Sequence, residues 1–128
     1  MAKFSFPKGA LNRNIPLLIW NSGTNQPFSG LVFNTTNLSG EYRREYQTSW
    51  VPISLAAGSV GVYTSGGLVA DGNQAGRYQF GLPNEIFATG NDRFALFSLY
   101  NVANMLPVNC ELELYEANFF DRNSLGVT

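Results

Sequence analysis

The sequence predicts a single-domain, all-β sandwich of about seven or eight short antiparallel strands, with one short helical turn near residues 83–89. The chain has 128 residues, of which 45% are hydrophobic and 14% aromatic, and this content favours one folded domain with its own core. Its 13 Gly and 14 Asn residues fall mostly between short apolar runs. Because both residue types tolerate positive φ, this placement indicates many turns and few long helices.

Short apolar runs and alternating runs mark the expected strands. Strands are expected over residues 14–21, 31–36, 38–50, 50–56, 77–82, 92–101 and 108–117, with a hairpin in 58–71 around Ser65 to Gly67. Turn signals separate them at roughly the 8–12-residue spacing of sandwiches. The run from 92 to 101 is apolar on both faces, which predicts a central strand buried on both sides.

The clearest alternation lies between residues 77 and 82. Tyr78, Phe80 and Leu82 share one face, while Arg77 and Gln79 share the other. The first face is expected to point into the core. The following residues, PNEIFATG (83–90), predict the helical turn, because proline stands at its start, a glutamate follows early and a glycine ends it.

The expected domain covers residues 15–117, with an N-terminal arm over 1–14 and a C-terminal tail over 118–128. Neither end segment shows a hydrophobic period, and each carries an aromatic pair. Two interpretations stay open for them: frayed termini, or segments that dock on a neighbouring protein. In the second interpretation, the docking residues are Phe4, Phe6, Phe119 and Phe120.

Charge and targeting signals argue against several classes of partner. The net charge is −1 and the eight Lys and Arg residues are scattered, so no basic stripe for nucleic acid is expected. No apolar run approaches the roughly 18 residues of a membrane span, and the start lacks the apolar stretch of a secretory signal. We therefore expect synthesis in a cytoplasm, and the sequons at Asn34 and Asn37 then carry little weight. Cys110 is expected to be a reduced, buried residue.

The residues of the chain offer little catalytic chemistry, so no enzyme activity is expected. Histidine is absent, which removes the commonest general base and most zinc sites. Glu111 and Glu113 share the outward face of strand 108–117, opposite Cys110, Leu112 and Leu114, and are the one plausible pair of acids. Alternating glutamates are more often a way to keep a sheet face wet.

No cofactor and no firm metal site are expected. Asp71, Asp92 and Asp121 stand in turns, where aspartate commonly bonds its own backbone, and they predict at most a weak calcium site.

Aromatic residues keep a second class of function open. A sugar-binding platform needs exposed aromatic faces beside polar side chains, and six residues are candidates, although strands favour aromatics for packing as well. These residues are Trp20, Tyr42, Tyr46, Trp50, Tyr63 and Tyr100.

Four segments resemble small virion proteins of tailed bacteriophages. They are GLVFNTTNLSGEY (30–42), GGLVADGNQAGRYQFGLP (66–83), FATGNDRF (87–94) and NVANMLPVNCELEL (101–114). The resemblance implies an immunoglobulin-like sandwich that serves as an accessory part of a head, tail or fibre attachment, with no active site. It also implies capsid, tail or fibre subunits as partners, and a homo-oligomer within the virion.

The segment AGRYQF (75–80) separates this chain from antibody domains. An immunoglobulin tyrosine corner usually carries an acid shortly before the tyrosine and a cysteine two residues after it. Here Gln74 stands four residues before Tyr78, and Phe80 takes the place of the cysteine. The function that the resemblance to virion proteins implies is a non-enzymatic structural accessory protein, either a capsid decoration or a tail or fibre adaptor. The alternative is a module that binds a receptor or glycan on the host surface.

Overall fold

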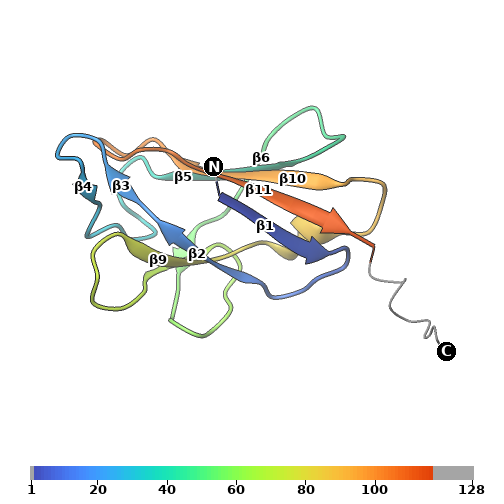
Figure 1. The fold of residues 1–128 in the computed structure, drawn as a ribbon, viewed down its shortest axis with the longest axis horizontal. Helices are drawn as coiled ribbons and strands as arrows, with labels where there is room; N and C mark the ends of the chain where they lie inside the picture. The colour runs from blue at the N-terminus through green and yellow to red at the C-terminus, as the bar shows by residue number, and fades with distance from the viewer. Residues whose placement is uncertain (1, 117–128) are drawn as a thin grey trace.

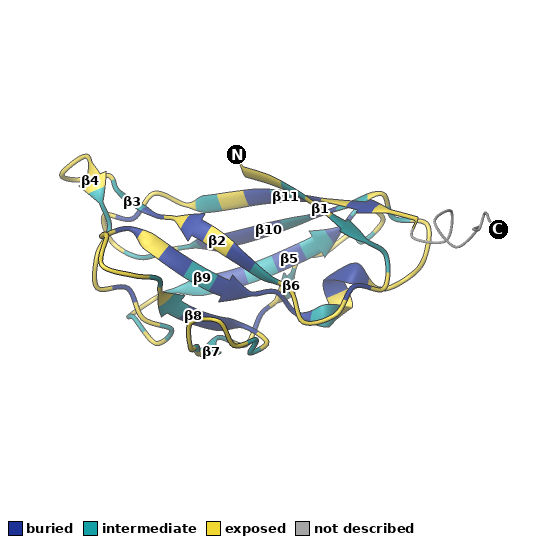
Figure 2. Cartoon of the chain, turned by 60° about the horizontal axis from the view of Figure 1, so that its bottom comes forward, coloured by how far each residue is buried: buried dark blue, intermediate teal, exposed yellow. Residues whose placement is uncertain are grey.

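Two main β-sheets face each other and share one hydrophobic core (Figures 1 and 2). The computed structural model describes residues 2–116. The five-stranded sheet has the order β1 (Ala2–Pro7), β11 (Val108–Tyr115), β10 (Phe94–Tyr100), β5 (Ser39–Arg44) and β6 (Val51–Pro52). The four-stranded sheet has the order β2 (Asn14–Leu18), β9 (Arg77–Gly81), β8 (Gly67–Ala70) and β7 (Ala56–Ala57). A short pair, β3 (Trp20–Asn21) and β4 (Gln26–Pro27), extends one end.

The core forms because alternate residues of the strands turn inward. Tyr78, Phe80 and Leu82 are all at most 2% exposed, as their alternation predicts. The ring of Phe80 on β9 lies 4.7 Å, centroid to centroid, from that of Phe97 on β10, so this contact joins the two sheets. Cys110 on β11 is also buried, as expected. The all-β prediction is confirmed.

The expected helical turn is present as the 3-10 helix η1 (Asn84–Phe87). Ile86 and Phe87 of this turn are fully buried, and η1 contacts β5 of the opposite sheet. Within residues 2–116, no helix is long and apolar enough to cross a membrane.

The prediction that all strands are antiparallel is wrong in two places. β1 pairs in parallel with β11, from Ala2 opposite Cys110 to Pro7 opposite Tyr115. β7 pairs in parallel with β8, so residues 58–71 do not form the expected hairpin. Gly66 lets the segment before β8 lie close to Ser54, in the segment before β7. Its φ is +72°, and a Cβ there would lie 2.1 Å from the Ser54 carbonyl oxygen.

The predicted strand over 31–36 is also absent. These residues form turns, in which the Val32 amide donates to the Thr35 hydroxyl at 2.9 Å. The Leu31 amide donates instead to the Tyr78 hydroxyl, at 3.2 Å. The strand predicted over 38–50 ends at Arg44, because the chain turns there and the Gln47 side chain accepts a hydrogen bond from the Arg44 amide.

The N-terminal segment differs most from expectation, because residues 2–7 form strand β1 and not a free arm. β1 is the edge strand of the five-stranded sheet and pairs along most of β11. Phe4 and Phe6 are half-buried against the core, while Lys3 and Ser5 face outward. Burial of the two phenylalanines compensates for the ordering of this terminus.

Candidate functional site

The four aromatic residues expected to dock on a partner divide into two pairs. Phe4 and Phe6 pack within their own chain, with the Phe6 ring 4.8 Å from the ring of Phe87. A docking role for this pair would therefore require β1 to leave its sheet. Phe119 and Phe120 lie outside the described residues.

One surface that fits a binding role is a groove with exposed leucines where β11 begins. We call it the Leu106 groove; it has a volume of about 330 Å³. Leu18 and Leu106 are 64% and 45% exposed, values that are high for leucine in a folded chain. The groove is lined chiefly by Ala2, Leu18, Trp20, Leu106, Pro107 and Val108.

The β10–β11 connection brings Leu106 beside the β2–β3 segment. The Leu106 amide donates to the Trp20 carbonyl at 3.0 Å, and Asn21 and Met105 form an isolated antiparallel bridge. Met105 turns inward and is 6% exposed, so its neighbour Leu106 turns outward. Two residues of the connection, Asn101 and Asn104, adopt positive φ, which asparagine tolerates better than most residues.

The Trp20 ring is held in place within the groove. Its indole N–H donates to the Asn25 side-chain oxygen at 3.0 Å, so the polar end of the ring is satisfied. The apolar face of the ring can then contact a ligand without leaving a donor unpaired.

One feature of the sequence is consistent with this groove, although none of the predictions above uses it. Leu17 and Leu18 are consecutive in a strand, and successive side chains of a strand point to opposite faces. Leu17 is 5% exposed, and Leu18 must therefore face outward. A single outward leucine is common on protein surfaces, so Leu18 indicates a contact surface only because the structure places Trp20 and Leu106 in the same groove.

The acids considered as a catalytic pair are engaged by the edge strand. The Ser5 hydroxyl donates to Glu113 at 2.7 Å, and Lys3 lies 3.8 Å from Glu111. Both contacts run between outward faces of β1 and β11. They fit a role in fastening the edge strand to its neighbour.

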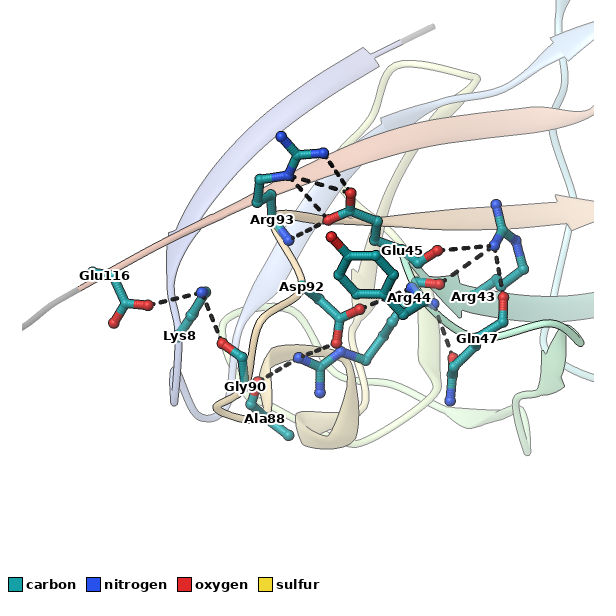
Figure 3. Close-up of polar contacts among 11 residues, drawn as sticks. Lys8, Arg43, Arg44, Glu45, Gln47, Ala88, Gly90, Asp92, Arg93 and Glu116 are labelled. Atoms are coloured by element: carbon teal, nitrogen blue, oxygen red, sulfur yellow. Dashed lines mark hydrogen bonds and ion pairs between the residues drawn. The ribbon is translucent and has the colours of Figure 1, made fainter.

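A second polar cluster lies where β1, β5 and β11 end and β10 begins, at the other end of the five-stranded sheet from the groove. Figure 3 shows its contacts. Arg44 forms an ion pair with Asp92 at 2.9 Å and donates to the Ala88 carbonyl oxygen at 2.6 Å. The other carboxylate oxygen of Asp92 accepts from the Tyr46 amide at 2.9 Å. Asp92, which the sequence suggested as part of a weak calcium site, therefore uses its carboxylate to hold the loop before β10 against the end of β5.

Two further ion pairs belong to the same end. Glu45 pairs with Arg93 at 2.6 Å, and hydrogen bonds from Arg93 hold the pKa of Glu45 below its ordinary value. Lys8 donates to the Gly90 carbonyl oxygen at 2.9 Å and pairs with Glu116 at 2.8 Å. Within residues 2–116, His, Cys, Asp and Glu side chains form no group of three or more that could hold a metal ion.

The six aromatic candidates for a sugar platform do not gather in one place. Trp20, Tyr42 and Tyr100 each line a different surface hollow. The Tyr63 hydroxyl donates to the Leu82 carbonyl oxygen at 2.7 Å, and the Tyr100 hydroxyl donates to Glu41 at 3.0 Å.

The remaining two candidates, Trp50 and Tyr46, are exposed near the end of β5. The Arg43 guanidinium lies 5.9 Å from the centroid of the Trp50 ring.

Comparisons of the chain with protein-family models, curated proteins and solved structures found no match.

Proposed function

We propose that the chain is a non-enzymatic structural accessory protein of a tailed-phage particle, and that it acts through protein–protein contacts. The observation that carries this proposal is the Leu106 groove, where two exposed leucines flank a fixed tryptophan. Tryptophan is enriched among the few interface residues that supply most of the binding energy. The resemblance of four segments to small virion proteins supports the choice of particle.

We also propose that the sandwich is immunoglobulin-like. In that fold, strands A, B, E and D form one sheet, and strands C, F and G form the other. The order β2-β9-β8 fits strands B, E and D, and the order β11-β10-β5 fits strands G, F and C. A sandwich of this kind suits a building block, because it presents its loops and ends from a rigid body.

Repetition makes a small contact surface sufficient for this function. A groove of this size binds one partner weakly. On a symmetric particle, a protein held by one contact meets the next site at a high effective concentration, so many weak contacts act together.

Incorporation into particles tests the proposal. Particles are assembled in cells that express an epitope-tagged copy, either wild type or Leu106→Asp, and the tag is quantified in purified particles. We expect Leu106→Asp to lower incorporation about tenfold or more, because burying a charge in place of a leucine costs at least about 1.4 kcal/mol.

Leu11→Asp is the matched control. Leu11 is 64% exposed, as Leu18 is, but it does not line the groove. This variant should be incorporated normally. Equal incorporation of Leu106→Asp and wild type would contradict the proposed role of the groove, and absence of the wild-type chain from particles would contradict the proposed function.

A further inference from the structure

The Leu106 groove lies at the start of β11, and the described part of the chain ends at Glu116, just past the other end of that strand. Val108, the first residue of β11, lines the groove. Residues 117–128 follow Glu116, just after β11 ends at Tyr115. This segment carries the adjacent aromatic residues Phe119 and Phe120.

The lengths involved decide which chain these rings can reach. A strand rises about 3.3 Å per residue, so Val108 and Glu116 are about 26 Å apart. Phe119 and Phe120 are three and four residues beyond Glu116, and even a fully extended chain would carry Phe120 only about 14 Å from it. A phenylalanine side chain is too short to make up the difference. The rings therefore cannot enter the groove of their own chain.

We propose that the Leu106 groove binds Phe119 and Phe120 of a second copy of this chain. The inference rests on the proposed function and names one partner of the groove. The apolar faces of Leu18 and Leu106 would cover a phenyl ring, and the fixed ring of Trp20 would meet it in a tilted or edge-to-face contact. Each copy carries this groove at the start of β11, and its aromatic pair follows the end of that strand in the sequence.

This arrangement makes the contact head-to-tail. Different surfaces of two copies meet, so the interface is heterologous and generates a closed ring or an extended row of copies. A ring or row with the groove end of one copy against the tail end of the next is the kind of assembly that a collar or a surface layer requires. Each contact is small, and ring closure or attachment to a particle strengthens it.

Mixing two disabled variants of the full-length chain tests the inference. Leu106→Asp should prevent binding in the groove and leaves the C-terminal aromatic pair unchanged. The double variant Phe119→Ala/Phe120→Ala removes the aromatic pair and leaves the groove unchanged. Sedimentation velocity over a rising protein concentration should show association of the wild type and a monomer for each variant alone. An equimolar mixture should form dimers and nothing larger, because only one pairing of groove and tail remains.

Two controls accompany the mixture. Leu125→Ala changes an apolar residue of the same segment outside the aromatic pair and should associate as the wild type does. Circular dichroism checks folding, and Leu18→Asp replaces Leu106→Asp if the latter spectrum differs from that of the wild type.

A wild-type chain that stays monomeric, or a mixture that stays monomeric, would overturn the inference. Its failure is separable from failure of the proposed function. If incorporation into particles needs Leu106 although copies do not associate, the groove binds another virion protein and only the inference falls. If copies associate as expected but the wild type is absent from particles, only the proposed function falls.

Discussion

At the scale of single residues, the Tyr78 hydroxyl links segments that are far apart in the chain. It donates to the Phe28 carbonyl oxygen at 2.7 Å and accepts from the Leu31 amide at 3.2 Å, while the residue is 2% exposed. The alternation of residues 77–82 predicts that this ring faces inward. It cannot predict the partners of the hydroxyl, which lie 50 and 47 residues earlier.

Removing this hydroxyl should destabilise the protein more than its size suggests. Tyr78→Phe keeps the ring but leaves two backbone groups unpaired, and we expect the free energy of unfolding to fall by about 1–3 kcal/mol. Urea unfolding monitored by circular dichroism measures the change. Tyr115→Phe, at a 38% exposed position, is the control and should change stability little. Equal stability of the two variants would contradict this account of Tyr78.

Cys110 gives a prediction about pH. Burial raises the pKa of its thiol to about 11, whereas an unfolded cysteine has a pKa of about 8.5. The folded state therefore holds the proton more tightly. The contribution of the protonated Cys110 thiol to the free energy of unfolding is fully present below about pH 8.5 and is lost as the pH rises through about 11.

The buried thiol should not react with a thiol reagent at pH 8 in the folded protein, and should react fully after unfolding in urea. Unfolding curves between pH 8 and 11 should show a loss of stability that is smaller in Cys110→Ala. Rapid reaction of the folded protein at pH 8 would show that the thiol is accessible and would contradict this assignment.

At the scale of elements, β1 differs most from the prediction, because the sequence analysis expected a free arm where the structure has a paired strand. Lys3 and Ser5 alternate with Phe4 and Phe6, which is the period of a strand, but six residues are too few to separate this pattern from chance. The sequence also cannot show that the partner is β11, more than a hundred residues later. Local periodicity predicts which face a side chain takes, whereas strand pairing depends on contacts between distant segments.

Deleting residues 1–7 should therefore destabilise the fold, because it exposes the edge of β11 and the Phe87 ring. Phe6→Ala, a milder change, should lower the free energy of unfolding by about 1–3 kcal/mol, since the ring is only half-buried. Lys3→Ala is the control on the same strand; its ion pair is exposed, so the effect should be below about 1 kcal/mol. Thermal unfolding of the deletion variant, Phe6→Ala and Lys3→Ala, each measured beside the wild type, gives these changes in stability. Unchanged stability after the deletion would show that β1 contributes little.

The elements that were predicted well share a feature. The strands β9 and β11 alternate cleanly between apolar and polar residues, and η1 is preceded by Pro83 and has Glu85 in its first turn. The predicted strand at 31–36 lacked such alternation, and the structure has turns there. Residues 45–50 continue the alternation of β5 but turn away, because side chains such as Gln47 compete for the backbone of Arg44.

At the scale of the whole molecule, the fold leaves its two ends chemically different. One end has the Leu106 groove with its exposed leucines, and the other has the ion pairs of Arg44, Lys8 and Arg93 (Figure 3). The groove combines segments near Ala2, Leu18 and Leu106, which are far apart in sequence. The groove is the basis of both the proposed function and the proposed contact between copies.

The sequence by itself determined that the protein is all-β, which residues of its clearest strands face inward, and where the helical turn lies. These properties follow from local chemistry, because the two-residue period of a strand and the backbone preferences of proline, glycine and asparagine act over a few residues. Only the tertiary structure decided that β1 pairs in parallel with β11, that Asp92 pairs with Arg44, and that Leu18, Trp20 and Leu106 share one groove. Those features depend on which strand edges meet and which side chains the packed sheets leave uncovered, and a local pattern carries no information about either.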